Sequence, residues 1–396
     1  MRFNFDENID RRNTNSIKYD FMSERGKAED LIPLWVADMD FKVPDAVTEA
    51  LAEAVDHGIF GYSDSRADYF DAVRNWYKNR FSYDVKEEWL VKTPGIVFAL
   101  ATAIRAFTAK GDGVIIQQPV YYPFSGLVLS NERRLVNNPL IYKDGKYYID
   151  FDDFEEKIIR EKVKLFLLCS PHNPVARVWT RKELRRLGDI CLKHNVIVVS
   201  DEIHADFVYG KNKHIIFPGI RPEYLNNTVL CTSPSKTFNM PGLQVSNIFI
   251  ANDKLRLQFI KTIRKTGYSH LNTLGIVACT AAYEHGAQWL EALKVYLWEN
   301  ISFVKGFLES QIPQVKLVEP EGTYLLWLDF SALKLKDDDL EELIEKKAKL
   351  WLSPGRAFGA GGQGFQRLNI ACPRQVLEQA LLQLKRAIDC SYRPLA

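Results

Sequence analysis

Lys236 closes the sequence SPSK (233–236), directly after the apolar run TVLCTS (228–233). A lysine at the end of a buried strand loses solvent, which lowers its pKa and makes it a usable amine nucleophile. The hydroxyls of Ser233 and Ser235 are hydrogen-bond donors suited to a phosphate group. The alternative is a solvated loop lysine, and this motif alone does not choose between the two.

Asp201 follows the apolar run VIVVS (196–200). A residue in this place is often the N-cap of a helix. It can also be a buried carboxylate paired with a cationic ring nitrogen, which keeps the ring protonated and able to accept electrons. Asn173, in the sequence HNP, has two interpretations as well: a hydrogen bond to the phenolic oxygen of such a ring, or the start of a turn before Pro174.

Three further features are candidates for ligand binding. Arg367 follows a Gly-rich loop and precedes a strand, where its guanidinium suits a substrate carboxylate, although a surface ion pair is the alternative. Tyr121, in PVYYPF, can stack on a flat ring or simply pack against apolar neighbours. The sequence TPGIVFALATAIRAF reads as a turn entering a helix, and helix N-termini bind phosphate through free N–H groups, here those of Gly95, Ile96 and Val97.

The elements that must position these residues are short apolar runs that alternate with helical patterns. The runs are continuous and rich in Val and Ile, as expected for strands buried on both faces; they are VIIQ (114–117), KLFLLCS (164–170), VIVVS (196–200), TVLCTS (228–233) and SNIFIA (246–251). Between two of them, TRKELRRLGDICLKHN predicts a helix with Thr180 as N-cap and Glu183 at the capping-box position. Strand, helix and strand at this spacing predict a mainly parallel α/β sheet.

Parallel sheets bind ligands beyond the carboxyl ends of their strands. The segments that follow three of the predicted strands are polar: SPHNP (170–174), DEIH (201–204) and SPSK (233–236). Each is weak evidence alone, but together they form one candidate site.

Composition excludes several classes of protein. The 396 residues are 46% hydrophobic and 26% charged with a net charge of +2, and no Lys/Arg stripe suggests a nucleic-acid surface. The N-terminus is charged from the start and has no apolar core, so no secretory signal is expected, and no run of 18 apolar residues predicts a membrane span. None of the six cysteines forms a CxxC pair. We therefore expect reduced thiols in a cytoplasmic protein without a metal site.

The length fits one large and one smaller domain. We predict a large domain over residues 51–287 and a small α+β domain made of residues 1–50 and 288–396. In the second half, a long helix is predicted from about 288 to about 310. It is followed by the strand GTYLLWLDF, the helix LKDDDLEELIEKKAK and the strand RLNIA.

Taken in order, these motifs resemble the class I/II aminotransferase superfamily of pyridoxal-phosphate (PLP) enzymes. More narrowly, the chain is similar to the MalY/PatB-type cystathionine β-lyases, the carbon–sulfur lyase branch that includes cystalysin. The segments that carry this resemblance are WVADMDF (35–41), PVYYPF (119–124), SPHNPV (170–175), SDEIH (200–204), PSKTFN (234–239), GTYLLWLDF (322–330) and RLNIACP (367–373).

The resemblance implies the cofactor PLP, an aspartate-aminotransferase-like fold and a homodimer with shared active sites. It implies that Lys236 forms the Schiff base, that Asp201 pairs with the pyridine nitrogen and that Tyr121 stacks on the ring. The other implied contacts are Asn173 to the phenolic oxygen, His204 to the cofactor, Ser233, Ser235, Gly95, Ile96 and Val97 to the phosphate, Tyr62 to the phosphate of the neighbouring subunit, and Arg367, Asn173 and Ala37 to the substrate.

The chain departs from the aminotransferase pattern at three positions. Gln244 stands eight residues after the lysine, where an arginine usually binds the phosphate, so the phosphate charge must be balanced in another way. His204 replaces a tyrosine that is common three residues after the aspartate, as in the lyase branch. Ala176 replaces the glycine of NPxG, which could shift that loop.

The implied reaction is αβ-elimination on L-cystathionine or a related cysteine-type amino acid, giving a thiol, pyruvate and ammonia. Transamination uses the same site and starts with the same proton removal, so no residue decides between the two by mechanism. A regulatory role through a protein partner, known in this branch, is a third interpretation that the sequence does not test.

Overall fold

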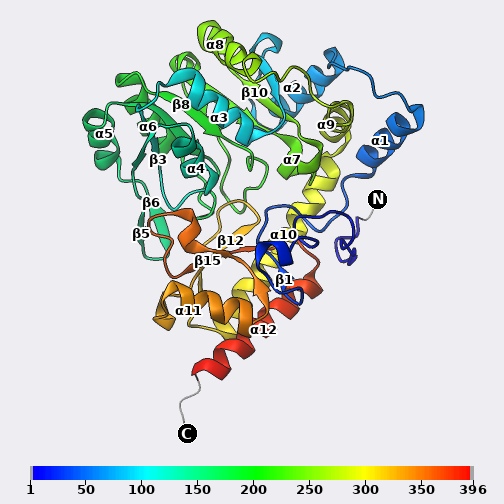
Figure 1. Cartoon of the computed structure of the whole chain (residues 1–396), viewed down its shortest axis with the longest axis vertical. Coiled ribbons are helices and arrows are strands. Elements are labelled where there is room, and N and C mark those ends of the chain that lie inside the picture. Colours follow the sequence, from blue (N-terminus) through cyan, green and yellow to red (C-terminus); the bar gives the residue numbers. More distant parts are fainter. Residues whose placement is uncertain (1–2, 393–396) are drawn as a thin grey trace.

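A seven-stranded sheet forms the upper part of the computed structural model, which describes residues 3–392 (Figure 1). Its order is β2-β10-β9-β8-β7-β3-β4. The strands are β2 (Leu90–Thr93), β3 (Gly113–Ile116), β4 (Arg134–Asn137), β7 (Val163–Cys169), β8 (Ile197–Asp201), β9 (Thr228–Thr232) and β10 (Ser246–Phe249). All five apolar runs singled out in the sequence are strands of this sheet.

The predicted mainly parallel arrangement is confirmed. Strands β4, β3, β7, β8 and β9 run parallel to one another. Only β10 runs against its neighbours β9 and β2. The carboxyl ends of β7, β8 and β9 therefore meet at one edge of the sheet.

Helices cover both faces of this sheet, which explains why its strands are continuously apolar. On one face, α5 (Phe151–Arg160) and α6 (Arg181–Lys193) pack against side chains such as Phe166 of β7. On the other, α3 (Ile96–Phe107) and α8 (Asp253–Arg264) pack against side chains such as Leu165. The predicted capping box of α6 is present, with Thr180 and Glu183 bonding reciprocally.

The lower part of Figure 1 holds a smaller antiparallel sheet of order β11-β12-β15-β14. Its strands are β11 (Lys316–Leu317), β12 (Leu325–Asp329), β14 (Ser353–Pro354) and β15 (Phe365–Asn369). The long helix α10 (Ala287–Gln311) leads into it, and α11 (Asp337–Glu342) and α12 (Arg374–Tyr392) pack below it.

The N-terminal segment joins this C-terminal part of the chain. Strand β1 (Ile32–Pro33) pairs in parallel with β13 (Leu350–Trp351), as the proposed small domain requires. The domain boundaries themselves stay a prediction, and residues 1–2 and 393–396 lie outside the described part. The remaining elements are α1 (Asp45–His57), α2 (Ala67–Phe81), α4 (Pro123–Ser130), α7 (Pro234–Thr237), α9 (Thr273–His285), β5 (Ile141–Lys143) and β6 (Lys146–Tyr148).

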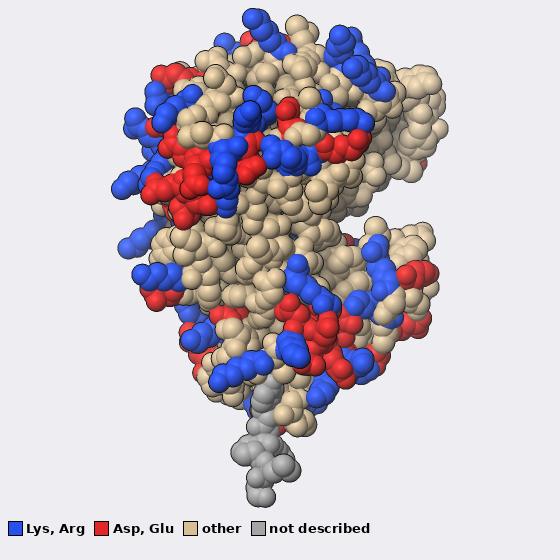
Figure 2. Space-filling model, turned by 60° about the vertical axis from the view of Figure 1, so that its left-hand side comes forward, with Lys and Arg blue, Asp and Glu red and all other residues tan. Residues whose placement is uncertain are grey.

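Over residues 3–392, no helix combines the length and the apolar character that crossing a bilayer demands. On the face drawn in Figure 2, basic and acidic side chains are interspersed, and no continuous basic stripe crosses it.

Candidate active site

A cavity of about 300 Å³ lies at the carboxyl ends of β7, β8 and β9. Most residues that the sequence singled out line it, although they come from both sheets and from the N-terminal segment. These are Ala37, Gly95, Ile96, Val97, Tyr121, Asn173, Asp201, His204, Ser235, Lys236 and Arg367. The edge of the parallel sheet is therefore the candidate active site, as the strand order requires.

Lys236 lies on the short helix α7, and its amine is enclosed. Its Nζ donates a hydrogen bond to the carbonyl oxygen of Ala37 at 2.7 Å. Burial lowers the pKa of this lysine to about 8, while Asp38 raises it, Arg367 lowers it and Asp201 raises it. A solvated loop lysine, the alternative interpretation, is excluded by this environment. Near neutral pH a useful fraction of the amine is unprotonated and nucleophilic.

Asp201 is the last residue of β8, and turns rather than a helix follow it. The N-cap interpretation is therefore wrong. Its Oδ1 accepts a hydrogen bond from the backbone N–H of Ile203 at 3.2 Å. Burial raises the pKa of this carboxyl to about 7, against the lowering effect of that bond. A buried carboxyl with so little compensation fits a cationic partner inside the cavity.

Arg367 belongs to β15 of the small sheet and reaches into the same cavity. Its NH1 donates to Asn173 Oδ1 at 3.0 Å, and its NH2 donates to the carbonyl of Trp35 at 2.7 Å and to Ser353 Oγ at 3.2 Å. It is 2% exposed. Nε has no partner, and no carboxylate of residues 3–392 pairs with this guanidinium. Burial lowers its pKa to about 10. The surface ion pair is therefore excluded, and a buried cation without a counter-charge fits an anion inside the cavity.

The half-buried Tyr121 and the buried His204 add flat surfaces to the cavity. Burial raises the pKa of the Tyr121 hydroxyl, and the backbone N–H of Tyr121 donates to the carbonyl of Asn173 at 2.9 Å. Burial lowers the pKa of His204 to about 3, so its ring is neutral, and its Nδ1 has no hydrogen-bond partner. Its ring stands edge-on to Tyr324, with the ring centroids 5.7 Å apart.

The opposite end of the cavity is rich in neutral donors. Helix α3 begins here, and its N-cap Gly95 has φ of 143°, a conformation that favours glycine. Ser235 and Gln244 line the same cavity. So does Ser246, the first residue of β10, which the sequence analysis missed. Its only sequence signal was its place at the start of a predicted strand.

Two residues predicted to contact the phosphate, Ser233 and Tyr62, do not line this cavity. Ser233 does not line it: its hydroxyl oxygen accepts the N–H of Ser235 at 3.1 Å and caps α7, and it lies 2.7 Å from the carbonyl of Val245. We therefore reassign Ser233 from phosphate ligand to support of α7. Tyr62 is fully exposed (102%) and lines a neighbouring hollow that shares Pro94 and Gln244 with the cavity.

The loop after Asn173 keeps a glycine-like conformation although it has no glycine. Ala176 is buried and has φ of 55°, which for a non-glycine residue costs about 1–2 kcal/mol. Its carbonyl accepts the N–H groups of Glu321 and Gly322. These hydrogen bonds hold Ala176 in its strained conformation, and the shift of this loop stays a prediction.

The donor set suits an organic anion rather than a metal. Within residues 3–392, no group of three or more His, Cys, Asp or Glu side chains could hold a metal ion. The cavity instead combines an amine of lowered pKa, a buried carboxyl, an unpaired guanidinium and a helix N-terminus. This set fits PLP, whose aldehyde, ring nitrogen and phosphate need an amine, a carboxylate and N–H donors.

Residues 29–384 match the family described as "Aminotransferase class I and II". The chain belongs to this family. It is 44% identical to cystathionine beta-lyase PatB of Bacillus subtilis over 98% of this chain and 100% of that protein. It is 33% identical to protein MalY of Escherichia coli over 98% and 99% of the two chains.

Two related crystal structures share the whole architecture of this class I/II protein. Cystalysin from Treponema denticola, which contains PLP, superposes with a TM-score of 0.96 at 38% identity and covers 99% of this chain and 100% of its own. The PLP-bound C-S lyase of Staphylococcus hominis has a TM-score of 0.91 at 36% identity and covers 98% of each chain. The predicted aminotransferase-like fold is thereby confirmed.

Proposed function

We propose that the protein is a PLP-dependent carbon–sulfur β-lyase that cleaves L-cystathionine or a related cysteine-type amino acid. The observation that carries the proposal is the buried, unpaired guanidinium of Arg367 in the same cavity as Lys236. An amine nucleophile and a carboxylate receptor facing one cavity are what an α-amino acid substrate needs. Identity to a named cystathionine beta-lyase and similarity to a C-S lyase favour elimination among the reactions of this site.

The residues that would hold the cofactor follow from the fit. Lys236 would bind its aldehyde carbon, Asp201 its ring nitrogen and Asn173 its phenolic oxygen. Tyr121 and His204 would lie against the ring. The N–H groups at 95–97 and the hydroxyl of Ser235 would take the phosphate. Gln244 offers an amide where related enzymes have an arginine, so the phosphate charge is met by neutral donors and by the N-terminus of α3.

When bound, PLP supplies an electron sink for the electron pair released at the substrate Cα. Arg367 orients the amino acid by its α-carboxylate. The freed amine of Lys236, neutral above about pH 8, takes the proton from Cα onto Nζ. Asp201, as a carboxylate, keeps its cationic partner protonated. A thiolate then leaves Cβ, which is tolerable near neutrality because thiols ionise near pKa ~8.5. Addition of one water completes the products: thiol, pyruvate and ammonia.

A two-substrate assay separates this function from transamination. Purified protein with PLP is incubated with L-cystathionine alone, and separately with an amino acid plus 2-oxoglutarate. Pyruvate and homocysteine in equal amounts are expected from the first reaction. Glutamate as the main product of the second, without pyruvate in the first, would instead make the protein an aminotransferase.

We further propose a homodimer in which Tyr62 completes the partner's phosphate site. The support is the exposed loop that carries Ile59 (71% exposed), Phe60 (60%) and Tyr62 (102%), next to the rim of the cavity. Sedimentation should give about twice the chain mass of 45.5 kDa. A fully active monomer would exclude the shared site. A cytoplasmic location is also proposed, because the six cysteines are all free and five are buried.

A further inference from the structure

The segment 35–41 forms one wall of the cavity and contacts both of its cations. The carbonyl of Ala37 accepts hydrogen bonds from Lys236 Nζ at 2.7 Å and from the hydroxyl of Tyr324 at 3.0 Å. Two residues earlier, the carbonyl of Trp35 accepts from Arg367 at 2.7 Å. The position of this backbone therefore fixes where the lysine amine rests.

Two asparagines hold the backbone of the segment from either side. Asn239, three residues after Lys236, accepts the N–H of Met39 at 2.8 Å and donates to the carbonyls of Met39 and Phe41 at 3.0 and 2.7 Å. Asn369, two residues after Arg367, donates to the carbonyls of Val36 and Asp38 at 2.7 and 2.6 Å.

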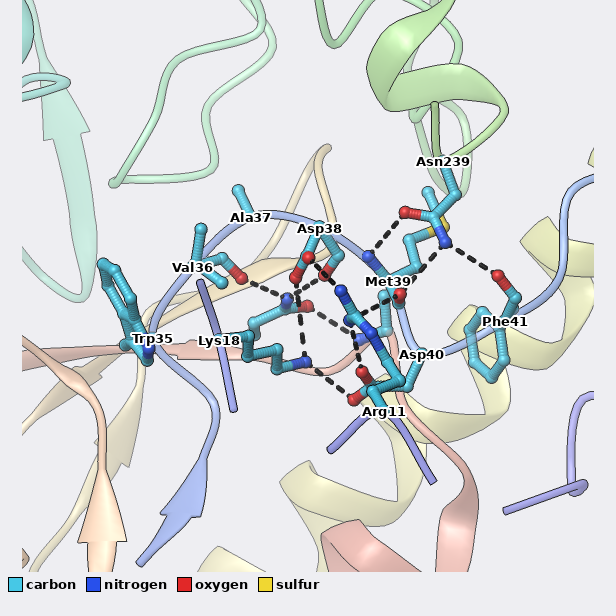
Figure 3. Close-up of polar contacts among 12 residues, drawn as sticks. Arg11, Lys18, Trp35, Val36, Ala37, Asp38, Met39, Asp40, Phe41 and Asn239 are labelled. Atoms are coloured by element: carbon cyan, nitrogen blue, oxygen red, sulfur yellow. Dashed lines mark hydrogen bonds and ion pairs between the residues drawn. The ribbon is translucent and has the colours of Figure 1, made fainter. Parts of the chain in front are cut away.

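The acidic side chains of the segment point away from this backbone into a partly buried charge cluster, made of Arg11, Lys18, Asp38 and Asp40 (Figure 3). Arg11 donates to Asp38 Oδ2 at 2.6 Å and to Asp40 Oδ1 at 2.8 Å. Lys18, whose side chain is 0% exposed, donates to Asp40 Oδ2 at 2.7 Å and lies 3.9 Å from Asp38 Oδ1. Within this cluster, the positive charges of Arg11 and Lys18 thus balance the two carboxylates.

We propose that Arg11 and Lys18 are positioning residues for Lys236, which hold the segment 35–41 through Asp38 and Asp40 and balance the charge beside the lysine amine. Neither cation touches the cavity, so neither is a catalytic residue. This inference rests on the proposed function, because it assigns Lys236 as the reacting amine. It adds that Arg11 and Lys18, both in the N-terminal segment, tune that amine from outside the cavity.

The direction in which each substitution shifts the pKa of Lys236 follows from the charges that face its amine. Asp38 and Asp201 favour its protonated form and Arg367 disfavours it. The ring of His204 is neutral, and the Ala37 carbonyl accepts a hydrogen bond from Lys236 Nζ. Removing Arg11 leaves the carboxylates of the cluster in excess, which raises the pKa of the lysine. Removing the charge of Asp38 leaves the cations in excess, which lowers it.

The test uses three variants, Arg11→Gln, Asp38→Asn and the double variant, with Arg12→Gln as the matched control. Arg12 is the next residue, its side chain is 71% exposed, and it pairs with exposed Asp10. The readout is the pH midpoint at which Lys236 of the cofactor-free, full-length chain reacts with trace acetic anhydride, measured by mass spectrometry of its peptide. The pH titration of the absorbance of the PLP-loaded enzyme compares the same variants at the nitrogen that links Lys236 to the cofactor.

Arg11→Gln should raise the midpoint by about 0.5 pH unit or more, and Asp38→Asn should lower it by a similar amount. The double variant should return close to the wild-type midpoint, and Arg12→Gln should not move it. Simple loosening of the segment would move both single variants in the same direction, and that result overturns the proposal. If Arg11→Gln does not fold, the charge-balanced double variant must still lie above Asp38→Asn; equal midpoints overturn it.

These measurements need neither substrate nor turnover. A protein that fails to cleave cystathionine can still give the opposed midpoints, so failure of the proposed function and failure of this inference are distinguishable.

Discussion

Replacing Arg367 with alanine tests how the substrate is recognised. A guanidinium has five N–H donors. Three of them are used, by Asn173, Trp35 and Ser353, which leaves two without a partner in the described chain. A substrate carboxylate that takes up two charge-assisted hydrogen bonds from Arg367 would lose both in the variant.

The size of the loss follows from these two bonds. Hydrogen bonds to charged groups contribute about 1.5–3 kcal/mol each. Since about 1.4 kcal/mol is tenfold in rate, Arg367→Ala should lower kcat/KM for cystathionine by roughly a hundredfold or more. Arg367→Lys should recover only part of the lost kcat/KM, because an ammonium is a compact point charge and lacks the rigid planar fork of donors that matches a carboxylate.

The assay is steady-state kinetics alongside a PLP titration and a thermal melt. Arg356→Ala is the matched control, because this arginine precedes the same Gly-rich loop but its side chain is 45% exposed and pairs with Asp338 and Glu341. It should keep wild-type kcat/KM. An unchanged kcat/KM in Arg367→Ala, or a loss explained wholly by weaker PLP binding, would refute carboxylate recognition by Arg367.

Further outcomes are expected at the cofactor end and in the core. Lys236→Ala should abolish the link to PLP that borohydride traps, and a trapped adduct in this variant would place the link on another residue. In the wild type, the rate at which the link forms should rise with pH through about 8, because the neutral amine is the form that reacts. Asp201→Ala should lower turnover by orders of magnitude with PLP still bound. Near-normal turnover would make Asp201 merely structural. Gly188→Ala places a Cβ 2.4 Å from the Tyr224 ring, so chemical denaturation should show a loss of about 1–3 kcal/mol, whereas an unchanged unfolding midpoint would contradict that packing.

The large sheet could be predicted from the sequence because its strands are buried on both faces. That burial demands continuous apolar runs, and the helices between them demand a parallel order. The site could be located for the same reason, since polar residues such as Asp201 and Asn173 follow those runs directly. The antiparallel direction of β10 left no comparable trace, because its apolar run reads alike in either direction.

The contacts that decide the chemistry were harder to predict. The pattern SPSK suggests two phosphate donors, yet the hydroxyl of Ser233 is turned back to cap α7. Within the described chain no carboxylate pairs with Arg367, and this depends on which side chains two separate sheets bring together. The ion pairs of Arg11 and Lys18 join residues 20 to 29 positions apart in a stretch whose elements, such as β1, are short, so no helical or strand periodicity marks them.

The segment 35–41 explains how side chains of two distant elements meet at one cavity. Lys236 belongs to helix α7, which follows strand β9 of the large sheet, and Arg367 belongs to strand β15 of the small sheet. Yet each donates to a carbonyl of the same short stretch, at Ala37 and Trp35. Only Val36 separates these two carbonyls along the chain, so a shift of this backbone moves the resting places of the amine and the carboxylate receptor together. Fixing one irregular segment therefore sets the relative positions of the Lys236 amine and the Arg367 guanidinium.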